Sequence, residues 1–213
     1  MNFSRIEPAI LRSWRLEFQK HLFLILFSLF ILVLSLVTSY NAGRYADAAI
    51  GVHVTDLILD NFGPYDLGWF YTYVWIAIAA VFFIYPLIFK VNKLHEWISQ
   101  FALLAAIRGY FIILTHLSLR ITAVAVNFPK PIAWFIFQND LFFSGQVSVA
   151  FLGYFVFKES KIRYFFLISS ILIGIVSLLM HQHYSIDIFA AFFITYGSYK
   201  IGNKLFRVFK KTN

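Results

Sequence analysis

Long apolar runs recur along this chain, and they limit its fold more than any other feature. Six such runs, with few internal charges, are separated by short polar segments, and they span 22–40, 69–89, 97–117, 141–157, 164–180 and 186–206. Each run is close to the ~20 residues that an α-helix needs to cross the hydrocarbon core of a bilayer. Because 61% of the residues are hydrophobic and only 13% are charged, we predict an all-α polytopic membrane protein with six transmembrane helices.

The chain is predicted to form one membrane domain. Residues 1–20 form a polar cytoplasmic segment, 21–206 form the six-span domain, and 207–213 form a basic tail. A cleavable signal peptide is the alternative for the first run, but that run exceeds the usual ~7–15 apolar residues of such a peptide. We therefore favour an uncleaved anchor. The absence of Cys excludes disulfides, thiol catalysis and Cys-bound metals.

The net charge of +8 could indicate a nucleic-acid partner, but the positions of the basic residues indicate membrane topology instead. Fourteen of the 18 Lys and Arg residues lie on the side of the two termini, and three, Arg44, Arg120 and Lys130, lie on the other side. Because Lys and Arg accumulate in cytoplasmic loops, both termini are predicted to be cytoplasmic. The segment 181–187 then faces the non-cytoplasmic side, which is periplasmic or extracellular in a bacterium and lumenal in a eukaryote.

Two connecting segments on that side are longer than the others. In 41–68, apolar residues at helical spacing predict a short interfacial helix. These residues are Ile50, Val54, Leu57 and Ile58. The segment 118–140 is predicted to be a surface segment that is partly re-entrant.

Titratable residues crowd at the start of the last run, in His181-Gln-His-Tyr-Ser-Ile-Asp187. On a helix, His183 and Asp187 are four residues apart and share one face. A carboxylate in that position can hold one imidazole nitrogen as N–H and leave the other free to attack or to accept a proton. The alternative is that Asp187 caps the first turn of a helix while the histidines lie in the headgroup region.

Two further features are unusual for membrane spans. The fourth run begins with Ser144, Gly145 and Gln146, where free N–H groups of a helix start could bind an anion, although small residues also favour helix packing. Arg108 lies near the middle of the third run. A mid-span arginine indicates either a phosphate ligand or a buried ion pair with an acidic partner.

These motifs resemble a known group of enzymes. His183-Tyr-Ser-Ile-Asp187, Asp140-Leu-Phe-Phe-Ser-Gly145 and Ala106-Ile-Arg-Gly-Tyr110 are similar to motifs of the sphingomyelin synthase-like branch of the type 2 phosphatidic acid phosphatase superfamily, over about residues 95–200. The resemblance implies a six-span enzyme that transfers a phosphate-bearing headgroup through a phosphohistidine, without metal or other cofactor. It implies His183 as nucleophile, Asp187 as its orienting partner and Arg108 as a phosphate ligand. We place Ser144, Gly145, Tyr184 and His116 beside the substrate.

The chain departs from the family pattern at Gln146, where the family has a histidine that protonates the departing alkoxide. Glutamine can form hydrogen bonds but cannot titrate. Three explanations stay open: an engineered substitution, a natural inactive relative, or another acid in place of that histidine. His116 and His181 are the candidates for that acid, and both are weak. Leu178 follows Ser177 where the broader phosphatases have Ser-Arg, which favours the synthase-like branch.

The leading functional hypothesis is therefore a phosphotransferase that moves a headgroup from a phospholipid donor to a lipid hydroxyl such as that of ceramide or diacylglycerol, with low or no activity because of Gln146. A lipid phosphatase of the same superfamily and a non-catalytic lipid-binding relative are the alternatives. A small transporter would be expected to carry charged or helix-breaking residues in paired spans, and the runs 69–89 and 164–180 lack charged residues. No residue spacing predicts a metal site.

Overall fold

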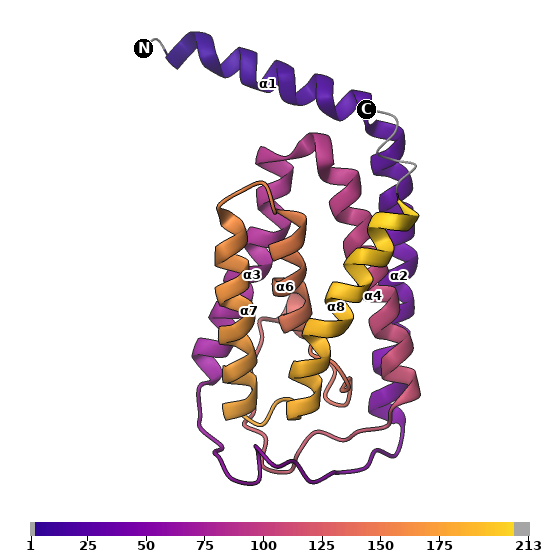
Figure 1. Cartoon of the computed structure of the whole chain (residues 1–213), viewed down its shortest axis with the longest axis vertical. Helices are drawn as coiled ribbons and strands as arrows, with labels where there is room; N and C mark the ends of the chain where they lie inside the picture. Colours follow the sequence, from indigo (N-terminus) through magenta and orange to yellow (C-terminus); the bar gives the residue numbers. More distant parts are fainter. Residues whose placement is uncertain (1–2, 207–213) are drawn as a thin grey trace.

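The computed structural model describes residues 3–206, and its regular structure within that range is helical (Figure 1). The helices are α1 Phe3–Lys20, α2 Leu22–Ala48, α3 Gly68–Phe89, α4 Leu94–Leu114, α5 Lys130–Ala133, α6 Gly145–Val156, α7 Ile162–Leu179 and α8 Ser185–Leu205, with a 3-10 turn, η1, at Val91–Lys93. Helix α1 lies across one end of a bundle that the longer helices form. The C-terminal end of α8 lies at the same end.

Four helical segments of the described chain are long and apolar enough to cross a membrane: α2, α3, η1 with α4, and α7. They indicate an integral membrane protein. The other two predicted spans correspond to α6 and α8. Helix α6 has 12 residues and extends only ~18 Å, since a helix rises about 1.5 Å per residue, whereas the hydrocarbon core is ~30 Å thick. Helix α8 has 21 residues but includes Asp187, Lys200 and Lys204.

Several predicted boundaries are wrong. No secondary structure was predicted for 1–20, and its described part is helix α1, which ends at Lys20. Helix α2 continues to Ala48, so the loop does not begin at residue 41. The fourth run is not helical from residue 141, because Phe142 has a φ of 122°, which is outside the helical region and rare for a side chain of this kind.

The predicted interfacial helix around residues 50–58 is also wrong, because this stretch forms turns and irregular chain. The Asp56 carboxylate accepts hydrogen bonds from the backbone N–H groups of Ile58 and Leu59 at 2.9 and 3.2 Å. Such local side-chain bonds compete with the helical ladder. Val52 instead pairs with Leu117 in an isolated bridge, so this loop is fastened to the chain that follows α4.

The core centres on aromatic side chains near the end of the bundle where α1 lies. Phe82 of α3 is fully buried, and its ring contacts five other aromatic rings at centroid distances of 5.3–6.1 Å, namely Phe83, Trp97, Phe101, Phe157 and Phe166. Edge-to-face packing of this kind is favourable beyond the area it buries. This cluster joins α3, α4, α6 and α7 into one rigid scaffold.

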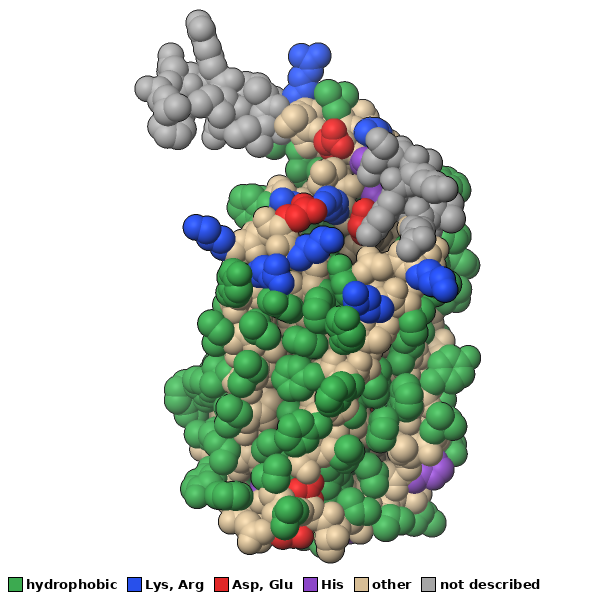
Figure 2. Space-filling model, in the orientation of Figure 1, with side chains coloured by type: hydrophobic (Ala, Val, Ile, Leu, Met, Phe, Trp, Pro, Cys, Tyr) green, Lys and Arg blue, Asp and Glu red, His purple; other side chains and the backbone are tan. Residues whose placement is uncertain are grey.

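Helix α6 begins inside the bundle rather than at its end (Figure 1). It packs along α7 and also contacts α8 and α3, while α2 packs along α4. The surface in Figure 2 is apolar over the middle of the bundle, and on that face the Lys and Arg side chains gather toward the end where α1 lies. The N-terminus of α6 is therefore placed at depth, between helices, on the side away from the basic end.

Candidate active site

His183 and Asp187 meet at the start of α8. The Nδ1 of His183 lies 3.2 Å from Oδ2 of Asp187, and both side chains are buried, with 7% and 0% of their area exposed. Because an ionised carboxylate only accepts, Nδ1 carries the hydrogen. The Nε2 of His183 makes no hydrogen bond to the described part of the chain. This arrangement leaves Nε2 with a free lone pair.

Asp187 performs both of the roles that were predicted as alternatives. Helix α8 begins at Ser185, so His183 lies just before it, and Oδ2 of Asp187 also accepts from the backbone N–H of Tyr184 at 2.9 Å. This is the acidic half of a capping box. The backbone at the start of α8 thus holds the Asp187 carboxylate in place, and the carboxylate sets the orientation of the His183 imidazole.

A second carboxylate supports the same helix end from the loop between α2 and α3. Oδ2 of Asp56 accepts from the backbone N–H of Ser185 at 2.6 Å. Burial raises the pKa of Asp56, but the hydrogen bonds from Ser185, Leu59 and Ile58 outweigh that effect and hold this pKa below its ordinary value. The contact was not predicted, since nothing in the sequence connects residues 129 positions apart.

His181 supports the turn rather than the chemistry. It is 3% exposed and has a φ of 57°. Its Nε2 donates to the carbonyl of Phe62 at 2.7 Å, and its Nδ1 shares a hydrogen bond with the hydroxyl of Thr122 at 2.6 Å. Both ring nitrogens are therefore engaged with neighbouring loops. This argues against His181 as the acid that replaces the missing histidine.

Arg108 of α4 reaches the start of α6. Its Nη2 lies 2.9 Å from both the carboxylate and the carbonyl of Asp140, and its Nε donates to the carbonyl of Phe143 at 3.3 Å. The ion pair that was one of two readings of Arg108 is therefore present, with side chains that are 18% and 16% exposed. Nη1 makes no hydrogen bond to the described residues.

The glycine at the start of α6 allows this close approach. A Cβ added to Gly145 would lie 2.9 Å from Nε and 3.1 Å from Cζ of Arg108. Ser144 is fully buried as the N-cap of α6, and its hydroxyl accepts from Val147 at 3.5 Å. The backbone N–H groups of Gly145 and Gln146 make no hydrogen bond to the described chain. A guanidinium and two free N–H groups therefore meet at one helix start, which is an arrangement suited to an anion.

The two groups of residues are joined directly. The backbone N–H of Ser144 donates to the carbonyl of Asp187 at 3.2 Å, which ties the start of α6 to the first turn of α8. Asp140 lies within electrostatic range of both Arg108 and His183. Residues from three separate motifs thus form one cluster.

Gln146 has a neighbour that the sequence did not single out. Tyr71 of α3 is 2% exposed, and its hydroxyl interacts with the side chains of Gln146 and Ser177. Tyrosine is common in an aromatic-rich span, so nothing in the sequence around Tyr71 marked it as a candidate site residue. The phenol places an O–H group beside Gln146, the position at which the chain departs from the motif that it resembles.

The side chains of two predicted substrate-binding residues contact neighbouring parts of the chain. Tyr184 is 2% exposed, and its hydroxyl donates to the carbonyl of Ser118 at 2.9 Å. This hydrogen bond connects the turn before α8 to the segment that follows α4. His116 is exposed, and its ring packs against Tyr45 with centroids 5.5 Å apart. The structure shows no contact between His116 and the cluster. Among the described residues, no group of three or more His, Asp or Glu side chains is placed to hold a metal ion.

Comparisons of this chain with protein-family models, with characterised proteins and with solved structures found no match. The family resemblance therefore rests on the three motifs, and the functional argument rests on the geometry of the cluster.

Proposed function

We propose that this chain is an integral membrane lipid phosphotransferase that uses Nε2 of His183 as its nucleophile, and that Gln146 leaves it with little activity. The observation that carries the proposal is the buried pair of His183 and Asp187, with Nδ1 committed to the carboxylate and Nε2 unbonded. This is the arrangement of an activated histidine. It is tied to a helix start and an arginine that suit a phosphate group.

The first chemical step transfers the headgroup to the enzyme. The lone pair of Nε2 attacks the phosphorus of a donor phospholipid, an N–P bond forms, and the P–O bond to diacylglycerol breaks. Positive charge that develops on the imidazole is stabilised by Asp187, which also holds the ring in the required tautomer. The departing oxygen takes the electron pair of the broken bond and a proton, which must come from water in this chain because Gln146 has none to give.

The second step returns His183 to its starting state. The hydroxyl oxygen of an acceptor lipid such as ceramide or diacylglycerol attacks the phosphorus, the N–P bond breaks, and the hydroxyl proton leaves to a base or to water. During both steps, the free N–H groups of Gly145 and Gln146 and the Nη1 of Arg108 stabilise the phosphate oxygens. Neither step requires a metal or another cofactor.

Gln146 limits the first step because an amide has no proton to give at neutral pH. Loss of a positioned general acid costs about 10²–10⁴-fold in rate. The phenol of Tyr71 lies beside Gln146 and can donate a hydrogen bond to the departing oxygen, but an ordinary phenol with a pKa of about 10 is a weak acid at neutral pH. Turnover by this chain is therefore expected to be very low.

The proposed topology follows from the basic residues. Helices α6 and α8 complete a six-helix arrangement with the four apolar segments, both termini are cytoplasmic, and the cluster opens to the non-cytoplasmic side. The clustering of Lys and Arg at the end of the bundle where α1 lies supports this orientation. The donor and acceptor lipids then enter from the bilayer, and no nucleic acid takes part.

A second candidate function is a non-catalytic lipid-binding relative, which Gln146 specifically favours. A phosphatase that uses water as acceptor would share the first step. An acceptor assay in liposomes separates the three functions, with Gln146→His compared with the unaltered chain and with His183→Ala in the Gln146→His background. Transfer by Gln146→His that requires His183 supports the proposal, and hydrolysis alone supports the phosphatase. A folded Gln146→His variant that binds phospholipid but performs neither reaction supports the binding relative.

A further inference from the structure

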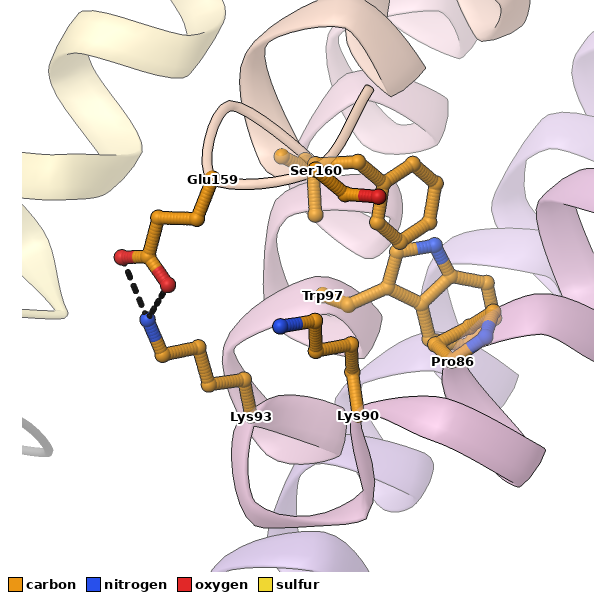
Figure 3. A pocket seen from close by; sticks show the side chains of 8 residues that line it. Pro86, Lys90, Lys93, Trp97, Glu159 and Ser160 are labelled. Carbon is orange, nitrogen blue, oxygen red and sulfur yellow. Dashed lines mark hydrogen bonds and ion pairs between the residues drawn. The ribbon is translucent and has the colours of Figure 1, made fainter. Parts of the chain in front are cut away.

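A pocket lies at the opposite end of the bundle from His183, among the turns near α1. It is lined by the end of α3, the start of α4 and the turn between α6 and α7. The pocket is shallow and open to solvent, and a water-sized molecule has about 20 Å³ of space inside it. The polar side chains in its wall are Lys90, Lys93, Trp97, Glu159 and Ser160 (Figure 3). None of them belongs to the candidate active site.

The two lysines of this pocket differ in what they bind. Nζ of Lys93 lies 2.6 and 2.7 Å from the two carboxylate oxygens of Glu159. The side-chain amino group of Lys90 makes no hydrogen bond or ion pair within the described chain, and Figure 3 shows it lying between Lys93 and Trp97. The pocket therefore presents one ammonium group that is not in contact with a carboxylate.

The surroundings add further positive charge. Lys158 and Lys161 lie in the turn between α6 and α7, and Arg163 lies at the start of α7. Over 90–97 and 158–163, five basic residues therefore stand against two acidic ones, Glu96 and Glu159. The pKa of Glu159 is held below its ordinary value, first by the hydrogen bond from Lys93 and also by the charges of Lys90 and Lys158. A positive potential of this kind attracts an anion.

Trp97 supplies an observation of a different kind. Its side chain lines the pocket and is 5% exposed, and its Nε1 is buried without a hydrogen-bond partner among the described residues. A buried N–H group without an acceptor is unfavourable, and native proteins nearly always satisfy it. A bound molecule with oxygen acceptors would do so.

We propose that this pocket is a second phosphate-binding site, in which Lys90 supplies the charged contact and Nε1 of Trp97 the neutral donor. The Pro86 end of α3 and the first turn of α4 place it where apolar helix gives way to polar turn, which is the depth of lipid headgroups. The phosphate of an anionic phospholipid is the ligand that fits this position, and a soluble phosphate compound offers the same chemistry.

The test is native mass spectrometry of the delipidated full chain titrated with phosphatidic acid, with phosphatidylcholine as the zwitterionic control. Lys90→Ala and Trp97→Phe are expected to weaken phosphatidic acid binding by about 10-fold, since a charge-assisted or buried hydrogen bond is lost. Lys200→Ala is the control: Lys200 is an exposed lysine on α8, away from the pocket, and packs over the ring of Tyr196. It is expected to change binding less than about 2-fold.

Binding at the candidate active site is separated by repeating the titration in an Arg108→Gln background. An effect of Lys90→Ala that persists there identifies an independent second site, because distant sites contribute additively. Competition by inorganic phosphate identifies a pocket that accepts free phosphate, and its absence identifies a lipid site. The proposal is overturned if Lys90→Ala and Lys200→Ala behave alike, or if the Lys90→Ala effect disappears once Arg108 is replaced.

Discussion

Arg108 and Asp140 form an ion pair of 2.9 Å at the point where α6 begins, so the arginine that the account assigns to phosphate already has a carboxylate partner. Arg108 can form the ion pair and also bind phosphate, because Nη2 makes the pair while Nη1 has no hydrogen bond to the described residues. The two roles predict different effects of replacing Arg108 and of replacing Asp140.

Arg108→Gln and Asp140→Asn both break the ion pair, and each is expected to destabilise the fold, by up to about 3 kcal/mol for a pair of this burial. Only Arg108→Gln should also weaken phospholipid binding, by about 10-fold. Asp140→Asn should preserve or strengthen binding, because it removes a competing negative charge. Thermal unfolding and lipid titration of both variants measure the two effects. Equal loss of binding in the two variants would show that Arg108 acts only through the pair.

The contact between Asp56 and Ser185 predicts a pH dependence of stability. Because the pKa of Asp56 is lower in the folded protein than its ordinary value of 3.8, the ionised carboxylate stabilises the fold. That stabilisation is fully present above the ordinary value and is lost as the pH falls through the folded-state pKa. Thermal unfolding of Asp56→Asn should therefore depend less on pH below about 4 than unfolding of the unaltered chain. Parallel pH profiles for the two proteins would refute the assigned role of Asp56.

Two glycines give a matched test of core packing. A Cβ added to Gly153 would lie 2.5 Å from the ring of Phe166, whereas one added to Gly197 would meet nothing within 4 Å. Gly153→Ala should lower the free energy of unfolding by about 1–3 kcal/mol, because Phe166 is fully buried and cannot move aside. Gly197→Ala should leave it unchanged or raise it by up to about 1 kcal/mol, since alanine favours a helix interior. A larger loss for Gly197→Ala would contradict the described packing of α6 on α7.

The proposed orientation can be measured by labelling. The chain has no Cys, so single-cysteine variants carry one label each. Asn61 and Lys158 are both exposed and lie in turns at opposite ends of the bundle. A membrane-impermeant thiol reagent should react with Asn61→Cys in intact cells and with Lys158→Cys only after permeabilisation. The reverse pattern would place the candidate active site on the cytoplasmic side.

The sequence predicted that His183 and Asp187 lie together, but it did not predict where the helices around them begin and end. His183 and Asp187 are four residues apart, and this local spacing is enough to bring them together once α8 begins at Ser185. The start of α6 was misplaced, since hydropathy cannot distinguish a helical Leu141 from one buried in irregular chain. The continuation of α2 to Ala48 was missed because its last turns carry Arg44 and Asp47.

Long-range partners could not be predicted from the residues alone. Tyr71 meets Gln146 only because α3 and α6 pack together. Asp56 reaches Ser185 because its loop folds across the end of the bundle. His116 was placed beside the substrate from its membrane depth, and depth does not determine which neighbour a side chain faces. In the structure its ring packs against Tyr45.

The central claim is that His183 is a nucleophile, and the most direct test is to trap the phosphorylated residue. The Gln146→His variant would be incubated with phospholipid in the absence of an acceptor lipid, quenched at alkaline pH to preserve phosphohistidine, digested and analysed by mass spectrometry. We expect a phosphate-bearing headgroup on His183, which disappears when acceptor lipid is added and fails to form when Asp187→Asn is added to the same variant. A folded Gln146→His variant that turns over lipid while His183 stays unmodified, or that carries the group on another residue, would contradict it.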